Sequence, residues 1–369
     1  MGAMAKTEQP EALGLKDGEG APLRKKPATL SDVAREAGVV AMTASRAING
    51  TGYVSQEVRE RVHAAARKLN YRPNMLARSL KGQRLKAVGI MLPDIANPFS
   101  AELVEGMKDV LEPEGYTPFI ALAGRGVDHE REGLQSFVDH RVDGLLVATL
   151  RTDMGDEFLR ELGAQGIPMV TVGREVKGMQ VDCVTADHWQ GAFELTMHLI
   201  ELGHRLIGFV GIAAADAPAL PRYQGYLAAL EKAGLAVGPE YTVGPGHAPS
   251  FATQDDGYDG MMRLAELVAP PTAVVARNDS AAIGVLRAAH TLGMKVPEDL
   301  SVAGFDNIPL AAFWTPALTT VAQPIREQGK LAARTLLDKI EGKSTGAGET
   351  RTMACELVVR ESTGKCSKR

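Results

Sequence analysis

The sequence predicts an α/β protein in which a small all-helical head precedes a much larger, two-lobed body. From about residue 86 onward, short apolar stretches alternate with amphipathic helical stretches, a pattern typical of a doubly wound parallel sheet. Residues 28–80 show only short stretches of helical periodicity, separated by Gly and Asn. The full 369 residues exceed what one core organises, so we expect a head and two similar α/β lobes.

Composition narrows the class of protein. With 45% hydrophobic and 23% charged residues, the chain has a typical globular composition. No apolar run approaches the roughly 18 residues of a membrane span, and the first 30 residues lack the apolar core of a signal peptide. Cys183, Cys355 and Cys366 are odd in number and widely spaced, so we expect a cytoplasmic protein with no disulfide framework, metal or cofactor.

Charge is distributed unevenly along the chain. The first 86 residues hold 16 Lys/Arg against 8 Asp/Glu, whereas the remaining 283 hold 25 basic and 37 acidic residues. This asymmetry predicts a head that binds a polyanion. A solvated basic tail would explain 24–26, but not residues 28–86, where 11 basic residues face 4 acidic ones within helical sequence.

Capping signals define three short helices in the head. Thr29 has the spacing of a capping box with Asp32, and Gly38 ends this first helix. A second helix is expected over 41–48, closed by Asn49 and Gly50, and Ser55 caps a third. Residues 1–27 have no hydrophobic period, and we expect them to be disordered.

The first two helices and the tight turn between them match a helix-turn-helix, whose second helix enters the major groove. The core side of that second helix is Ala44, Ala47 and Ile48. Its polar side consists of Thr43, Ser45, Arg46 and Asn49. Hydroxyls and a guanidinium suit phosphates and base edges. Three small helices could also form a protein-interaction module, an alternative that spacing alone leaves open.

Longer motifs in the head resemble the LacI/GalR family of repressors. They are Thr29–Val39 (TLSDVAREAGV), Thr43–Gly50 (TASRAING) with Val54-Ser55, and Asn70–Leu80 (NYRPNMLARSL), which resembles the family's hinge. The resemblance extends from about residue 28 to 363 and implies a regulator whose DNA affinity is controlled by a small molecule. It divides the chain into a 1–27 extension, a 28–72 DNA-binding head, a 73–85 hinge helix and linker, an 86–363 effector-binding and dimerisation domain, and a 364–369 tail.

The resemblance also implies a set of DNA contacts. They are Thr29, Val40, Ala41, Met42, Thr43, Ser45, Arg46, Asn49, Tyr53, Asn74, Ala77, Arg78 and Leu80. Ala41 and Met42 take positions that face base edges, where apolar side chains suit thymine methyls. Val40 departs from the family's usual hydroxyl residue, which weakens the helix start by about 1 kcal/mol. The 74–80 segment is expected to pair with its two-fold mate in the minor groove, with Leu80 as the wedge.

The body is expected to form strands such as 87–92, 144–148, 168–172, 206–210, 272–276 and 300–305. A ligand should then lie outside their carboxyl ends, in a cleft between two lobes. Motifs including Leu92–Phe99 (LPDIANPF) and Gly304–Asn307 (GFDN) resemble the family's regulatory domain. The resemblance implies a lining of Asp94, Asn97, Phe99, Arg174, Arg222, Asn278, Asp279 and Asp306.

This lining suits a polyhydroxylated molecule, and its two arginines hint at a sugar acid or sugar phosphate. Arg222 and Asp306 are the strongest candidates, each expected in a loop just past a strand. Asp94 and Asp279 could instead cap the helices that follow them, and Arg174 could lie in a surface turn.

Other functions fit the sequence less well. Phosphate-binding, serine-nucleophile and zinc motifs are absent from the sequence, so we do not expect an enzyme. His188, His198 and His204 are expected on helix faces, and a sugar-transport protein would need a signal peptide. One recognition helix makes too few contacts to be specific, so we expect a homodimer on a pseudo-palindromic operator in double-stranded DNA, away from any membrane.

Overall fold

The structure is a computed structural model that describes residues 28–71, 84–123, 127–148, 154–176, 178–213, 217–245, 252–344 and 348–367. The chain separates into two compact units, Met1–Lys81 and Gly82–Arg369. The 1–27 extension and the 74–80 hinge segment lie outside the described residues, so the expectations for them remain predictions.

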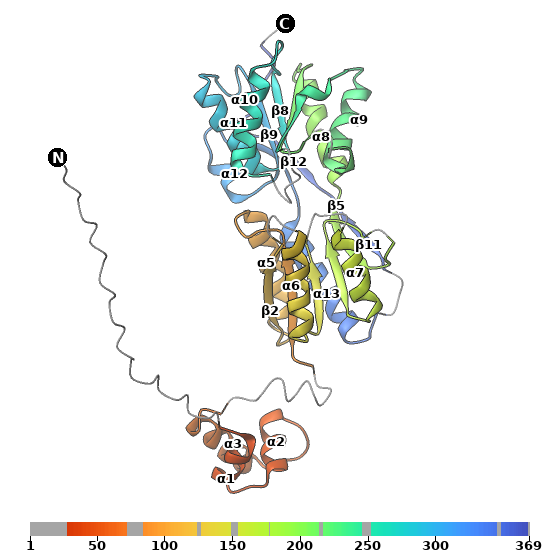
Figure 1. Ribbon diagram of the computed structural model, residues 1–369. Coiled ribbons are helices and arrows are strands. Elements are labelled where there is room, and N and C mark those ends of the chain that lie inside the picture. The colour runs from red at the N-terminus through yellow and green to blue at the C-terminus, as the bar shows by residue number, and fades with distance from the viewer. Residues whose placement is uncertain are drawn as a thin grey trace, which may run out of the picture. The chain divides into compact units, whose positions relative to one another are not determined.

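In its described residues, the head folds into the helices α1 (Leu30–Glu36), α2 (Ala41–Asn49) and α3 (Gln56–Lys68) (Figure 1). The expected capping box at Thr29 and Asp32 is confirmed, as is the Ser55 cap of α3. Gly50 ends α2 with a φ of 64°, a left-handed conformation that glycine adopts without strain.

Small apolar side chains from all three helices form the core of the head. The buried members are Val33, Ala34, Ala37, Ala44, Ala47, Val62 and Ala65. At the surface, Lys68 Nζ lies 2.6 Å from Glu36 Oε1 and links α3 to α1. The core therefore holds α2 by its alanine side and leaves its opposite side free to contact another molecule.

The first lobe of the body is a six-stranded parallel sheet in the order β11-β5-β4-β3-β1-β2. Its strands are β1 (Ala87–Leu92), β2 (Thr117–Leu122), β3 (Gly144–Val147), β4 (Met169–Val172), β5 (Asp182–Ala186) and β11 (Thr350–Met353). Its helices are α5 (Pro98–Leu111), α6 (Val127–Asp139), α7 (Met154–Ala164) and α13 (Ile325–Ile340) (Figure 1).

The second lobe has the sheet order β12-β10-β9-β8-β6-β7, in which only β12 runs antiparallel to its neighbour. Its strands are β6 (Ile207–Val210), β7 (Thr242–Val243), β8 (Ala273–Ala276), β9 (Ser301–Asp306), β10 (Thr319–Ala322) and β12 (Glu356–Val358). Its helices are α8 (His188–Glu201), α9 (Pro221–Lys232), α10 (Gln254–Ala265), α11 (Asp279–Thr291), α12 (Pro309–Phe313) and the single turns η1 (Ala217–Ala219) and η2 (Pro239–Tyr241).

The chain crosses between the lobes three times, from β5 to α8, from β10 to α13 and from β11 to β12. Helices cover both faces of each sheet, and buried apolar side chains fill the space between them. Because the strands are parallel, the loops that follow them gather at one end of each sheet. These two ends line the same cleft.

The six strands named from the sequence are confirmed to within one residue at each end. The expectation for His204 was wrong. His204 follows α8 rather than lying on it, is buried, and bonds Thr272 Oγ1 and Ser301 Oγ at 2.9 Å. Burial lowers its pKa, so this imidazole ties three segments together as a neutral group. Among the described helices, none is both long and apolar enough to cross a membrane.

Candidate DNA interface and effector cleft

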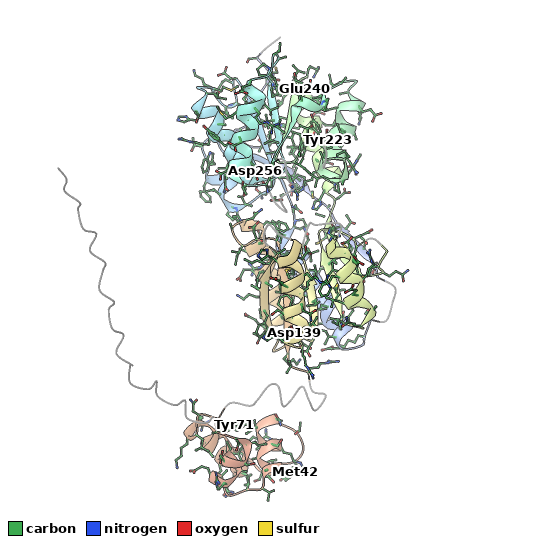
Figure 2. The ribbon with its side chains drawn as sticks, in the orientation of Figure 1. Met42, Tyr71, Asp139, Tyr223, Glu240 and Asp256 are labelled. Atoms are coloured by element: carbon green, nitrogen blue, oxygen red, sulfur yellow. The ribbon has the colours of Figure 1, made fainter. Side chains whose placement is uncertain are left out.

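The exposed side of α2 begins with apolar residues. Val40 is 70% exposed and Met42, labelled in Figure 2, is 65% exposed. Val40 occupies the N-cap position with extended backbone and makes no side-chain capping hydrogen bond, as expected from the sequence. The first N–H groups of α2 are therefore left without a side-chain acceptor from Val40.

Polar residues follow one turn further along α2. Asn49 Nδ2 donates to Ser45 Oγ at 3.2 Å, and Thr43 is half-buried. Arg46 is exposed and makes no ion pair among the described residues of the head. Tyr53, just after α2, is 93% exposed. These residues form one accessible surface that suits phosphates and base edges.

One of the residues expected near DNA also has a structural partner. The Thr29 hydroxyl donates to the Asp32 carboxylate at 2.7 Å and so takes part in the cap of α1. Arg84, in the 73–85 hinge and linker region, donates to the carbonyl oxygen of Ile340 in the body. Asn74, Ala77, Arg78 and Leu80 lie outside the described residues.

The main cleft of the body is a cavity of about 610 Å³ lined by both lobes. This volume is in the range of small-molecule sites. Four of the expected ligand residues line it, namely Phe99, Arg174, Arg222 and Asn278. Further lining side chains include Thr185, His188, Trp189, Arg277, Gln323, Gln328, Thr350 and Thr352.

Arg222 is held in place from several sides. Its Nη2 lies 3.2 Å from Asp306 Oδ1, its Nη1 donates to the Arg277 carbonyl at 2.6 Å, and its guanidinium lies 4.0 Å from the centre of the Phe305 ring. The expected position in a loop was wrong, because Arg222 belongs to the first turn of α9. A rigidly held guanidinium at the cleft wall can donate to ligand oxygens with little loss of entropy.

Asp306 supports Arg222 from behind rather than lining the cleft. It is 2% exposed, ends β9 with a φ of 112°, and accepts a hydrogen bond from Gln323 Nε2 at 2.7 Å. Burial raises the pKa of this carboxyl, while the Arg222 charge opposes the rise. A non-glycine residue in this backbone region is strained, which is common where function fixes a side chain.

His188 continues the same polar chain into the cleft. Its Nε2 lies 2.9 Å from Gln323 Oε1, so the ring carries its proton on Nε2 and Nδ1 is an acceptor. Burial and the nearby Arg222 charge lower the pKa of His188 to about 3. The imidazole is therefore neutral at physiological pH, and its hydrogen bond to Gln323 sets which ring nitrogen carries the proton.

Arg174 also has a buried partner. Its Nη2 lies 2.6 Å from Asp156 Oδ1, and the Asp156 side chain is 3% exposed. The alternative of a simple surface turn was wrong, since the Arg174 side chain is only 15% exposed and lines the cleft.

Gln328 of α13 differs from the other polar side chains of the cleft. It is 1% exposed, and its Nε2 is buried with no hydrogen-bond partner among the described residues. Leaving a buried donor unpaired costs about 1–3 kcal/mol. A hydrogen-bond acceptor is the group that this donor lacks.

The remaining expected residues have local structural roles. Asp279 accepts from Thr320 Oγ1 at 2.5 Å and from Ile308 N at 2.8 Å, and is fully buried. Burial and the nearby Asp306 charge raise the pKa of Asp279 to about 8. The alternative in which Asp94 and Asp279 cap the helices that follow them was wrong, because Asn97 caps α5 and Asn278 caps α11.

Asp94 supports this arrangement by accepting a hydrogen bond from Asn97 N at 2.8 Å. Asn97 in turn accepts from Phe99 N at 3.0 Å, which fixes the residue whose ring lines the cleft. Asp94, Asn97, Asp279 and Asp306 thus surround the described lining rather than form it, and direct ligand contact by any of them remains a prediction.

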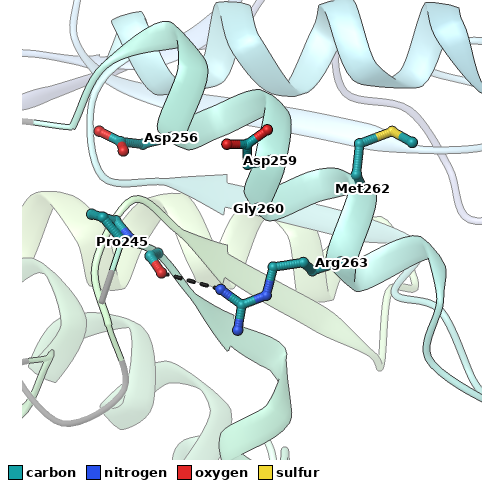
Figure 3. A pocket seen from close by; sticks show the side chains of 7 residues that line it. Pro245, Asp256, Asp259, Gly260, Met262 and Arg263 are labelled. Atoms are coloured by element: carbon teal, nitrogen blue, oxygen red, sulfur yellow. Dashed lines mark hydrogen bonds between the residues drawn. The ribbon is translucent and has the colours of Figure 1, made fainter. Parts of the chain in front are cut away.

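A second hollow lies at the edge of the sheet of the second lobe, between β7 and α10 (Figure 3). It is lined by Gly244, Pro245, Asp256, Asp259, Gly260, Met262 and Arg263. Asp256 is already the capping-box partner of Thr253, and Arg263 donates to the Gly244 carbonyl at 3.2 Å. The polar groups of this hollow are thus used partly to hold its own walls.

A helix-turn-helix head followed by a two-lobed body around a polar cleft is the architecture of a ligand-controlled DNA-binding regulator. Residues 29–74 match the family of bacterial regulatory proteins named lacI, and residues 196–363 match a periplasmic binding protein-like domain. The chain belongs to the LacI/GalR family of bacterial transcriptional regulators.

Individual relatives cover almost the whole chain. The HTH-type transcriptional repressor CytR of Escherichia coli K12 is 36% identical over 340 residues, which are 91% of this chain and 96% of the relative. The lac repressor dimer bound to operator and the anti-inducer ONPF is similar with a TM-score of 0.79 at 26% identity, over 92% of this chain and 100% of the other. The transcriptional regulator CelR in complex with cellobiose has a TM-score of 0.67 at 33% identity, over 91% and 99%.

Sequence reasoning missed His188, Gln323 and Gln328. Gln323 immediately follows β10 and His188 lies two residues past β5, two strands that were not among those named from the sequence. Residues just past the carboxyl ends of parallel strands line the ligand cleft, so predicting these two strands would have identified His188 and Gln323 as lining residues. Gln328 lies inside a helix, and no local pattern distinguishes it from a surface glutamine.

Proposed function

We propose that this protein is a repressor that binds a pseudo-palindromic operator as a homodimer, and that a neutral, polyhydroxylated molecule in the body's cleft changes its affinity for that operator. The observation that carries the proposal is a cleft with rigidly held polar groups in a chain whose head presents an exposed Arg46 on α2. The protein acts by binding rather than by catalysis, on chromosomal DNA in the cytoplasm.

The homodimer follows from the size of α2. A recognition helix of 9 residues reaches only a few base pairs, so one copy cannot provide the specificity of an operator. Two copies related by a two-fold axis read two half-sites. A relative of the same architecture is known as a dimer on its operator.

The neutral character of the ligand follows from the charges around the cleft. The two arginines expected there are each paired with a buried carboxylate, Arg222 with Asp306 and Arg174 with Asp156. The cleft therefore has no excess positive charge from this pair of arginines with which to compensate an anion. This argument disfavours the sugar acid or sugar phosphate at which the sequence hinted.

Several groups suit hydroxyls. Neutral His188 offers the acceptor Nδ1, Gln328 offers the donor Nε2, and the half-exposed Trp189 offers a ring face for the apolar side of a sugar. Relatives of similar fold hold cellobiose or ribose.

A thermal-shift screen of the purified full chain tests the ligand proposal. The screen compares neutral sugars and nucleosides with the corresponding acids and phosphates at equal concentration. We expect only neutral compounds to raise the melting temperature. Stabilisation by the anions alone would contradict the proposal.

A binding titration tests the DNA proposal. The logarithm of the association constant for duplex DNA should fall linearly with the logarithm of salt concentration, because binding releases counterions. A flat dependence would contradict a DNA-binding head.

A further inference from the structure

We propose that α2 selects its operator through the methyl groups of thymine rather than through hydrogen bonds at the start of the helix. The inference rests on the proposed function, because it concerns which bases the head reads. It is carried by the three successive residues Val40, Ala41 and Met42, all of which are apolar and exposed.

These side chains do not serve the fold of the head. The core contacts of α2 come from Ala44 and Ala47, which are 0% and 2% exposed. Val40 at 70% and Met42 at 65% are among the most exposed large apolar side chains of the described chain. Val40 also forgoes the side-chain cap that a Ser, Thr, Asp or Asn would supply at its position. The stability of the free head therefore gives no reason for this apolar cluster.

The position of Val40, Ala41 and Met42 at the start of α2 explains why they are apolar. In a helix-turn-helix, residues near the N-terminus of the second helix contact base edges in the major groove. Bidentate recognition of guanine needs Arg or Lys, and that of adenine needs Asn or Gln. None of the three residues has a polar side chain, so none can make either contact. What they can bury is the C5-methyl of thymine, the one apolar group on a base edge.

Polar contacts begin further along the helix. Arg46, one turn after Met42, is exposed and has no ion pair among the described residues of the head. We therefore expect a half-site in which thymines face the start of α2 and a guanine or a phosphate faces Arg46. Apolar contact to the methyls and charged contact to the neighbouring group then fix the register together.

The experiment first identifies the sequence and then removes methyls. A pool of synthetic duplexes with two randomised half-sites is selected on the full chain at physiological salt, and the enriched duplex is resynthesised with uracil in place of one thymine at a time. Uracil keeps both the base pair and the O4 acceptor, so only the methyl is lost. At the thymines facing α2 we expect about fourfold weaker binding for each methyl, the equivalent of ~0.8 kcal/mol for one buried carbon. Thymines outside the half-sites serve as the control and should show no change.

Two variants of Met42 test whether this side chain is the reader. Met42→Leu keeps an apolar side chain and should retain the dependence on thymine methyls. Met42→Gln should lose it and should shift the selected base towards adenine, which glutamine recognises. Because Met42 is exposed, both variants should keep the circular-dichroism melting curve of the parent.

Each outcome has a distinct meaning. If no sequence is enriched over the pool, the proposed function fails. If one sequence is enriched but uracil leaves its affinity unchanged at every position, the function stands and methyl recognition is overturned. Methyl recognition is also overturned if Met42→Gln keeps the uracil sensitivity of the parent at all positions.

Discussion

Replacing Gln328 by Met should stabilise the ligand-free protein and weaken effector binding. Gln328 is 1% exposed, and its Nε2 has no partner among the described residues. Methionine has a similar length and volume, a high helix propensity and no amide, so it fills the same space in α13 without the unpaired donor.

The expected magnitude follows from the cost of that donor. An unsatisfied buried polar group costs about 1–3 kcal/mol, so the variant should gain about 1–2 kcal/mol in its free energy of unfolding after a small packing loss. This gain corresponds to a rise in Tm of about 2–4 °C or more for a unit of this size. If a ligand acceptor satisfies Nε2, its loss should weaken effector binding about tenfold, the equivalent of ~1.4 kcal/mol.

Gln323 provides the matched control. It is also a buried glutamine of the cleft, but its amide donates to Asp306 at 2.7 Å and accepts from His188 at 2.9 Å. Gln323→Met removes both hydrogen bonds, so it should lower the free energy of unfolding. The same substitution is thus expected to act with opposite sign at two positions of one cleft.

Differential scanning calorimetry without ligand and isothermal titration with the effector measure the two quantities. A Gln328→Met protein that is less stable than the parent, or one that binds the effector unchanged, would refute the reasoning. The first result would mean that Nε2 is satisfied in the free protein, and the second that the ligand does not reach it.

Three further predictions concern the cleft, its support and the hinge. Arg222→Ala should abolish effector binding in a calorimetric titration while leaving DNA binding intact. Because the substitution leaves Asp306 buried without its partner Arg222, it should also lower the free energy of unfolding by about 3–5 kcal/mol. Unchanged effector affinity would count against the cleft as the effector site. The pKa of Asp279 is raised to about 8, so this group's contribution to stability is lost as pH rises towards 8. Above about pH 7.5, where the histidines are largely neutral in both the folded and the unfolded chain, the free energy of unfolding should fall with pH in the parent and stay flatter in Asp279→Asn. If urea unfolding at pH 7.5 and at pH 8.5 gives the same change in unfolding free energy for the parent and for Asp279→Asn, Asp279 is excluded as the source. Leu80→Ala should weaken specific DNA binding far more than non-specific binding in a mobility-shift titration, and equal losses would rule out a wedge.

The head could be predicted from the sequence almost completely, because its signals are local. Thr29, Asp32 and Ser55 cap helices through residues three positions away, and Gly50 ends α2 through its own backbone conformation. Such contacts depend only on spacing along the chain. The DNA sequence that the head binds cannot be read from such local signals. The sequence showed only that the residues at the start of α2 are apolar.

The strands of the body differed in how clearly they could be predicted. β1 is buried at every position and reads as a continuous apolar run, whereas β2 lies at the edge of the sheet with Phe119 and Ile120 half-exposed. An edge strand with mixed burial gives a weak pattern. When such a strand is not predicted from the sequence, the polar residues that follow it are not identified as candidates for the cleft either.

The cleft was predicted in place but only partly in composition. Phe99, Arg174, Arg222 and Asn278 line it as expected, yet the partners that decide its chemistry come from distant segments. Asp156 and Arg174 are separated by most of helix α7 and by strand β4, and Gln323 meets His188 across 135 residues. Pairing of this kind neutralises charges that look free in the sequence, which is why the arginines alone suggested an acidic ligand.

The coupling between cleft and head is the central claim, and one titration tests it most directly. The affinity of the full chain for its selected operator is measured by fluorescence anisotropy as the concentration of the neutral effector increases. We expect the operator Kd to change by about 5–150-fold at saturation, with the same factor appearing in the effector Kd when operator is present. An effector that binds the cleft and leaves the operator Kd unchanged would contradict the account.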